Sequence, residues 1–231
     1  AYGSSGSSAG SASATVAGLV PFAIGTETWG SIVSPSTTCG ATGLRPTFGS
    51  ISRSGAMALS YSLDKVGPIC RSASDAAIVF NYIHGTDGKD GSAVNMPFNY
   101  STKRDIKKLK IAYAKNYFDK IKDTTRADWQ ALKAFKEMGV TLIPVNFPDS
   151  GVYKFNIMDV VIGAECAAQF DDLTRSNQDD ILTRQTKNDW PNQFRTSRFV
   201  PAVEYINAQR HRYLLMKDVN ETIAPYDAII C

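Results

Sequence analysis

Residues 109–113, Leu109-Lys110-Ile111-Ala112-Tyr113, open the stretch that decides the fold, because apolar and polar side chains alternate there as in a half-buried strand. The segment 125–138 then carries Trp129, Leu132, Phe135 and Met138 on one helical face. Gly139 ends this helix, and residues 140–145 form a second strand-like run. Strand, helix and strand with short turns predict a parallel pair with a right-handed crossover, which indicates the α/β class.

Composition limits the class of protein. The chain has 231 residues, 43% hydrophobic and 20% charged, which is enough for one globular domain with a real core or for two small ones. A formal net charge of +3 is too small to indicate nucleic acid or a membrane surface as a partner. No stretch reaches the roughly 18 uninterrupted apolar residues of a membrane helix. We therefore expect no nucleic-acid partner and no membrane span.

Cysteines and histidines give no sign of a metal site. The four cysteines are far apart and form no CxxC motif: Cys39, Cys70, Cys166 and Cys231. Reduced thiols in a cytoplasm fit them best. His84 and His211 have no Cys or His partner at metal-ligand spacing. We expect no metal and no cofactor, and a hydrolytic mechanism has to find its base elsewhere than in histidine.

The N-terminal residues are rich in small side chains. Residues 1–12 are almost entirely Gly, Ala and Ser, a composition typical of a flexible linker or an expression tag. The run nevertheless continues into Ala12-Ser13-Ala14-Thr15-Val16-Ala17-Gly18, which predicts a helix ended by a glycine. Residues 19–24 are apolar and predict a short buried strand, with Pro21 at its entry.

This strand leads into Gly25-Thr26-Glu27-Thr28-Trp29-Gly30-Ser31-Ile32. Ser31 follows a glycine in a turn that leaves a strand, a position that exposes a hydroxyl for nucleophilic attack. The backbone N–H groups of residues 28–31 are close enough in sequence to converge on one oxygen. A serine in another small-residue loop, Ser7, is a candidate proton relay because its hydroxyl both donates and accepts. A lysine with a lowered pKa could serve as the base.

Two motifs together resemble the amidase signature family of serine hydrolases. Its pattern is a Gly-Ser-Ser-Gly-Gly-Ser-Ala loop, an apolar strand, and then Gly-Thr-Asp-x-Gly-Gly-Ser-Ile. Here the motifs stand as Gly6-Ser7-Ser8-Ala9-Gly10-Ser11-Ala12 and as residues 25–32. Three later segments are also similar to the family: Cys39-Gly40, Gly43-Leu44-Arg45-Pro46-Thr47 and Ser62-Leu63-Asp64-Lys65-Val66-Gly67-Pro68. The specific match covers residues 6–68, and beyond it the likeness is looser.

The resemblance implies a Ser-Ser-Lys triad. Ser31 would be the acylated nucleophile, and Ser7, 24 residues before it, the relay held by a cis peptide bond. Thr28, Trp29 and Gly30, with the N–H of Ser31, would form the oxyanion hole. The family's lysine lies upstream of residue 1. The implied fold is α/β, a mixed sheet with helices on both faces, present here as a central fragment truncated at both ends.

Three residues depart from the family pattern. Glu27 stands in place of an Asp, and Val33 in place of an Arg that often pairs with it, so we expect this ion pair to be lost or rebuilt. Trp29 stands in place of a glycine. Its N–H can still donate, and we expect its indole in the wall of the acyl pocket, where it bears on substrate size more than on mechanism.

We expect one amidase-type domain over residues 1–231. It divides into catalytic core motifs in 1–85, a linker or excursion in 86–108, and the remaining α/β part with the substrate pocket in 109–231. Further helices are predicted from Ser72 or Ser74 to Gly85, at 157–173 and at 201–222, with an irregular segment at 179–198 and a final strand at 226–231. Three carboxylates of the 157–173 helix are interpreted as a solvated face: Glu165, Asp171 and Asp172.

The leading hypothesis is an amidase that cleaves the C–N bond of a small-molecule amide and releases ammonia or an amine. A transamidating amidotransferase subunit would use the same residues and work with partner subunits, and a homo-oligomer is a further option. A different class is a non-catalytic protein whose Gly and Ser loop cradles phosphate, although the GxxxxGK[ST] pattern is absent. A fragment that keeps the fold without the activity stays open, because no lysine of this chain takes the family role.

Overall fold

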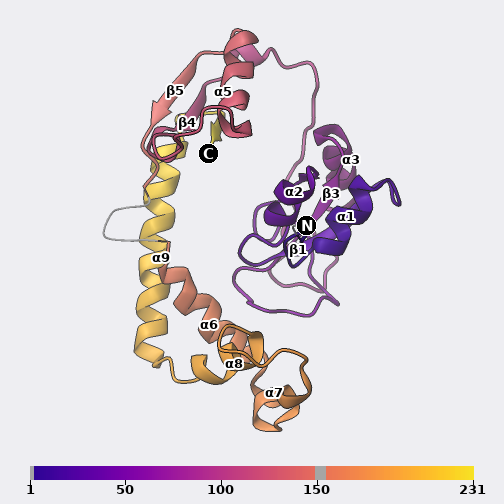
Figure 1. Cartoon of the computed structure of the whole chain (residues 1–231), viewed down its shortest axis with the longest axis vertical. Coiled ribbons are helices and arrows are strands. Elements are labelled where there is room, and N and C mark those ends of the chain that lie inside the picture. The colour runs from indigo at the N-terminus through magenta and orange to yellow at the C-terminus, as the bar shows by residue number, and fades with distance from the viewer. Residues whose placement is uncertain (1–2, 149–154) are drawn as a thin grey trace. The chain divides into compact units, whose positions relative to one another are not determined.

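The computed structural model describes residues 3–148 and 155–231. The chain divides into two compact units. Figure 1 shows their helices and strands. Unit 1 comprises residues 1–100 and 165–198, and unit 2 comprises residues 101–164 and 199–231. The chain first crosses from unit 1 to unit 2 after residue 100, which lies within the polar segment 86–108. Each unit contains its own sheet.

Unit 1 is built on a three-stranded antiparallel sheet in the order β1-β3-β2. Its strands are β1 (Ala23–Glu27), β2 (Thr42–Gly43) and β3 (Lys65–Cys70). Three helices belong to the same unit: α1 (Ala9–Val16), α2 (Val33–Cys39) and α3 (Ala73–Ile83). The side chains of Ala12, Ile32 and Ile69 are fully buried together, so α1, the segment before α2 and β3 share one core.

The first strand differs from its prediction. β1 begins at Ala23, four residues later than expected, and its buried side is formed by Gly25 and Glu27. Ile24 is 41% exposed and Leu19 is 77% exposed. The prediction of a buried strand at 19–24 is therefore wrong. Apolar character was a poor guide here, because the positions of β1 that face inward are a glycine and a carboxylate.

Two helices of residues 1–100, α1 and α3, agree better with the sequence. α1 starts at Ala9, three residues earlier than predicted, and Gly18 follows it with a positive φ of 73°. α3 begins after Ser72, whose hydroxyl accepts the N–H of Asp75 at 3.1 Å as an N-cap residue does. The helix therefore starts where its capping sequence predicted.

The second segment of unit 1 is more regular than expected. It contains the end of α6 (Ile157–Gln169), followed by α7 (Asp171–Arg175), the 3-10 turn η2 (Gln178–Ile181) and α8 (Trp190–Ser197). The expectation of an irregular segment at 179–198 is wrong for α8, which has Pro191 in its first turn, where proline is favoured. Phe194 is buried and stacks on Phe170, with 4.5 Å between the ring centroids. This contact packs α8 against Phe170, the residue between α6 and α7.

Unit 2 contains a parallel sheet in the order β5-β4-β6. Its strands are β4 (Ile111–Ala114), β5 (Leu142–Val145) and β6 (Ala228–Ile230), and its other elements are η1 (Ile106–Lys108), α4 (Lys115–Phe118), α5 (Ala127–Glu137) and α9 (Ala202–Ile223). Ile111 pairs with Leu142 on one side and with Ala228 on the other. The parallel strands predicted from 109–145 are thus confirmed. Met138, placed by the sequence on the buried face of α5, is 45% exposed.

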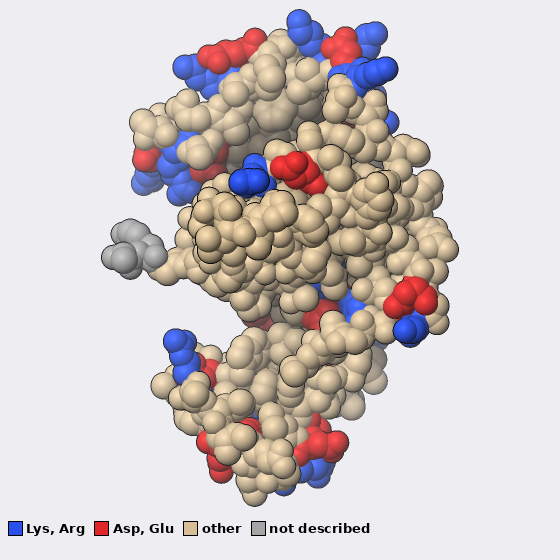
Figure 2. Space-filling view, turned by 90° about the vertical axis from the view of Figure 1, so that its right-hand side faces the viewer, with Lys and Arg blue, Asp and Glu red and all other residues tan. Residues whose placement is uncertain are grey.

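The α/β class is confirmed, with antiparallel strands in one sheet and parallel strands in the other. Charge is divided unevenly: residues 1–100 contain five of the 25 Lys and Arg and five of the 22 Asp and Glu. The side of this part that faces the viewer in Figure 2 is accordingly mostly uncharged. Within the described ranges, every helix falls short of the length and apolar character that a membrane span requires.

Candidate active site

The two sequence motifs meet in unit 1. The peptide bond Gly6–Ser7 is cis, as the family resemblance implied. The next N–H along the chain, that of Ser8, donates to the carbonyl of Ser31 at 3.1 Å. The predicted relay Ser7 therefore lies one residue from a direct contact with the predicted nucleophile. Ser7 is exposed and Ser31 is partly exposed, so both side chains are accessible within the described structure.

Neighbouring serines of the first motif hold it against β1. The hydroxyl of Ser8 donates to the carbonyl of Thr26 at 3.1 Å and accepts its N–H at 3.2 Å, and Ser11 donates to the carbonyl of Ile24 at 2.8 Å. A Cβ on Gly25 would lie 2.9 Å from the Ser8 hydroxyl, so only glycine permits this close approach. The buried Ser8 thus has a structural role that the exposed Ser7 lacks.

Glu27 anchors the far end of the nucleophile loop. Its carboxylate is fully buried and accepts the backbone N–H groups of Ile32 at 2.9 Å and Val33 at 3.0 Å. These N–H groups open α2, where a negative charge is favoured. The other carboxylate oxygen lies 3.5 Å from the guanidinium of Arg45. The ion pair that Val33 cannot make is therefore rebuilt with Arg45.

We predict that Glu27→Ala lowers the free energy of unfolding by about 2–3 kcal/mol, because it leaves two N–H groups without their buried acceptor. Arg45→Gln should cost less than about 1 kcal/mol, since the Arg45 side chain is 55% exposed and solvent screens its ion pair. Urea unfolding of both variants at neutral pH measures the difference. An equal loss from the two substitutions would show that the ion pair, and not the bonds to the N–H groups, stabilises this turn.

The segment between Glu27 and Ile32 contains the predicted oxyanion hole. Thr28 donates its hydroxyl to Asp64 at 2.5 Å, and Gly30 has a φ of 107° that other residues rarely adopt. In the part of the chain that the structure describes, the backbone N–H groups of residues 28–31 donate to no acceptor. Trp29 is 52% exposed. Its indole is thus not buried against the described residues, and the expected pocket wall stays a prediction.

The sequence did not predict that Glu165 is buried and binds the segment that contains Ser60 and Ser62. Glu165 is 6% exposed and accepts the hydroxyls of Ser60 at 2.5 Å and Ser62 at 2.7 Å, so its interpretation as part of a solvated face is wrong. The signal available was its apolar setting between Ala164 and Cys166. Burial also raises the pKa of the Cys166 thiol to about 11.

Asp171 of the same predicted face does pair at the surface. Its carboxylate lies 2.5 Å from Arg175 and 3.0 Å from Arg198, and all three side chains are partly exposed. The hydrogen bond with Arg175 is the main cause that lowers the pKa of Asp171. This residue therefore behaves as the solvated-face interpretation predicted.

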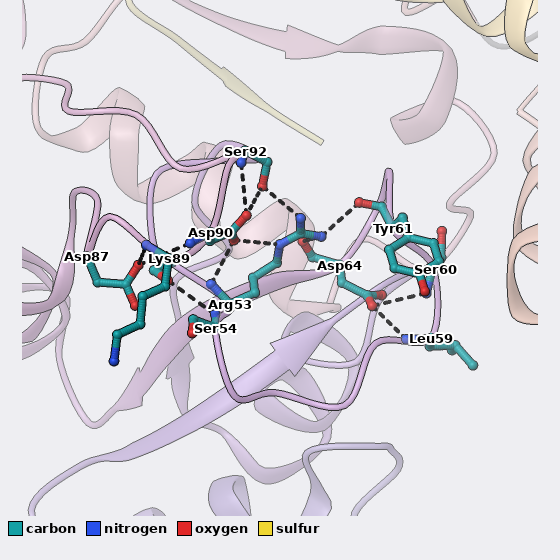
Figure 3. Close-up of polar contacts among 11 residues, drawn as sticks. Arg53, Ser54, Leu59, Ser60, Tyr61, Asp64, Asp87, Lys89, Asp90 and Ser92 are labelled. Atoms are coloured by element: carbon teal, nitrogen blue, oxygen red, sulfur yellow. Dashed lines mark hydrogen bonds and ion pairs between the residues drawn. The ribbon is translucent and has the colours of Figure 1, made fainter. Parts of the chain in front are cut away.

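The carboxylate of Asp90, which contacts Arg53, is held in its charged form. The hydroxyl of Ser92, at 2.6 Å, is the largest cause that lowers the pKa of Asp90, followed by the backbone N–H of Arg53 at 2.9 Å. The backbone N–H of Ser92 donates to the same carboxylate at 2.9 Å. Figure 3 shows these contacts around Arg53. The charged form of Asp90 is therefore bound more tightly in the folded chain than in the unfolded one.

We predict a pH dependence from this carboxylate. A lowered folded-state pKa gives stability that is present above the ordinary value of 3.8 and is lost as the pH falls toward the folded value. Asp90→Asn should therefore unfold at lower urea concentration than the wild type at pH 7, and the difference should shrink below about pH 4. Urea midpoints at pH 7, 4 and 3 test this. A difference that is constant with pH would contradict it.

The structure thus brings the Ser-rich loop of residues 6–12 against the strand-to-helix turn at Ser31 within an α/β fold. A family model described as Amidase matches residues 1–231. A glutamyl-tRNA(Gln) amidotransferase subunit of Macrococcus caseolyticus is 32% identical over 97% of this chain and 52% of its own length. The chain belongs to the amidase signature family, and it spans about half the length of the relatives it matches.

Solved structures agree with this assignment. A glutamyl-tRNA(Gln) amidotransferase subunit of Thermotoga maritima matches with a TM-score of 0.77 and 27% identity, over 98% of this chain and 49% of that one. A chain from a vestigial protein complex that reveals the origins of an s-triazine catabolic enzyme matches with a TM-score of 0.81 and 27% identity, over 98% of this chain and 48% of that one. Both similarities extend over nearly all of this chain.

Proposed function

We propose that the protein is an amidase that acts through an acyl-Ser31 intermediate. The observation that carries the proposal is the 3.1 Å hydrogen bond from the Ser8 N–H to the Ser31 carbonyl, which joins the two family motifs beside Ser7. Membership of the family supports the same reaction. The substrate class is a small carboxylic amide.

The reaction proceeds in two steps. The Ser31 hydroxyl attacks the amide carbonyl, and its proton passes through Ser7 to the base, which is the lysine that the resemblance places upstream of residue 1. The proton then returns through Ser7 to the leaving nitrogen as the C–N bond breaks. Water then attacks the acyl ester, which releases the carboxylate and restores the Ser31 hydroxyl.

Thr28, Trp29 and Gly30 stabilise the oxyanion through their backbone N–H groups. The proposal is supported by the position of these groups between two fixed points, the hydroxyl of Thr28 on Asp64 and the bonds of Glu27 to Ile32 and Val33. Donors held in place before the reaction stabilise developing negative charge most effectively.

A transamidating enzyme is the second candidate. The specific observation in its favour is that two relatives, 32% and 34% identical, bear the name of a glutamyl-tRNA(Gln) amidotransferase subunit. In that case the ammonia released by the same site passes to an acceptor, and partner subunits are required. A cytoplasmic location, inferred from four free cysteines, belongs to either proposal.

The proposal is tested with the protein expressed in full and purified from its native host. Ammonia release is measured from a panel of primary amides that includes glutamine, and copurifying chains are identified by mass spectrometry. If the protein is an amidase, it releases ammonia when no other protein chain copurifies with it. A transamidating enzyme requires copurified partners. No ammonia release from any amide of the panel, by the protein alone or together with its copurifying chains, would refute both candidates.

A further inference from the structure

The loop of residues 59–64, here named the Asp64 loop, is tied directly to the proposed oxyanion hole. One carboxylate oxygen of Asp64 accepts the Thr28 hydroxyl at 2.5 Å. The other accepts the N–H groups of Leu59 at 2.7 Å and Ser60 at 3.0 Å, which closes the loop on itself (Figure 3). The register of β1 and β3, with Glu27 opposite Lys65, places Thr28 and Asp64 at the adjoining position.

Arg53 supports the Asp64 loop from one side. Its guanidinium donates to the carbonyls of Tyr61 at 2.8 Å and Asp64 at 3.3 Å. The same group donates to Asp90 at 3.2 Å and to the Ser92 hydroxyl at 2.7 Å, and its side chain is 17% exposed. In Figure 3 Arg53 accordingly lies between the loop and the Asp90 carboxylate. A planar guanidinium with four described acceptors fixes the backbone of the loop in one position.

Glu165 supports the loop through a separate set of bonds. It accepts the hydroxyl of Ser60 at 2.5 Å, and the hydroxyl and N–H of Ser62 at 2.7 and 3.0 Å. Three polar groups of the loop thus donate to one buried carboxylate, which belongs to α6 and lies more than 100 positions later in the chain. A charged acceptor with short bonds holds its donors more firmly than a neutral one does.

We propose that Asp64 is a positioning residue for the oxyanion-stabilising N–H groups, and that Arg53 and Glu165 hold Asp64 in place. The inference rests on the proposed function. Asp64 fixes the first residue of the segment 28–31, while Glu27 fixes the backbone that follows its last residue. Oxyanion donors have to be placed before the reaction, and a shift of about 1 Å can cost on the order of 100-fold in rate.

Thr28→Val and Asp64→Asn test the proposal directly. Each should lower kcat for amide hydrolysis by about 10- to 100-fold with little change in KM, because the donors act on the transition state. The double variant should lose little more than either single one, since both remove the same contact. Thr28→Ser keeps the hydroxyl and should restore most of kcat. Two control variants away from the loop, Thr37→Val and Asp123→Asn, should keep the wild-type kcat, because Thr37 bonds within α2 and the exposed Asp123 bonds its neighbour Thr125.

Hydrogen exchange of the peptide that contains residues 28–34 gives a readout that does not need activity. Its hydrogen-bonded N–H groups are those of Ile32 and Val33, which donate to Glu27, and that of Ser34, which donates to the carbonyl of Gly30. Exchange should be faster in Thr28→Val and in Glu165→Gln than in the wild type, and unchanged in Thr37→Val. Unchanged exchange, or a kcat of Thr28→Val equal to that of the wild type, would overturn the positioning role. Absence of activity in the wild type with faster exchange in the variants would instead reject the proposed function alone.

Discussion

Ser31→Ala is expected to lower kcat for amide hydrolysis by at least about a thousand-fold, because it removes the atom that forms the acyl intermediate. Its side chain makes no hydrogen bond within residues 3–148 and 155–231, so the free energy of unfolding should change by less than about 0.5 kcal/mol. Initial rates and urea unfolding of the protein expressed in full measure the two quantities.

Ser34→Ala is the matched control for this variant. Ser34 lies three residues further along the chain, in the first turn of α2, and its exposed hydroxyl is 2.6 Å from that of Ser5. The control should keep the wild-type kcat. A Ser31→Ala variant that turns over at the wild-type rate would exclude Ser31 as the nucleophile, whatever the behaviour of the control.

Ser7→Ala is expected to lower kcat by about 10²- to 10⁴-fold, the range typical of a lost acid–base group. The side chain is exposed, so the variant should fold with wild-type stability. The adjacent substitution Ser8→Ala should behave differently and lower the free energy of unfolding by about 1–2 kcal/mol, because Ser8 bonds the edge of β1 at Thr26. Rates and urea midpoints of the two variants separate a proton relay from a structural serine.

Ser13→Ala serves as the control within α1. Among the described residues, the exposed Ser13 hydroxyl donates to the carbonyls of Ala9 and Gly10 in the first turn of α1. It should change neither rate nor stability beyond about 0.5 kcal/mol. Wild-type turnover in Ser7→Ala would remove the relay from the mechanism while leaving the role of Ser31 open to its own test.

Local patterns with a strong physical cause were predicted well from the sequence. The parallel pairing of β4 with β5 followed from alternation, one helical face and a closing Gly139. The start of α3 followed from the capping residue Ser72. The meeting of the two family motifs followed from the resemblance, and the cis bond at Ser7 agrees with it.

Features that depend on contacts distant in sequence were not predicted. β1 is placed by pairing with β3, so its inward positions are Gly25 and Glu27, not the apolar run before them. Glu165 lies more than 100 residues from the serines it binds, so its partners could not be predicted from the local sequence, although its apolar neighbours Ala164 and Cys166 indicated burial. The ion-pair partner of Glu27 was likewise not predicted, since Arg45 takes the role of an arginine that the family has at position 33.

The central claim is that Ser31 forms the acyl intermediate. Its most direct test treats the protein expressed in full with a fluorophosphonate probe and locates the adduct by peptide mass spectrometry. We expect one adduct of the probe, on the side chain of Ser31, and none in Ser31→Ala. An adduct on another residue that persists in Ser31→Ala, while Ser31 of the wild type stays unmodified, would contradict it.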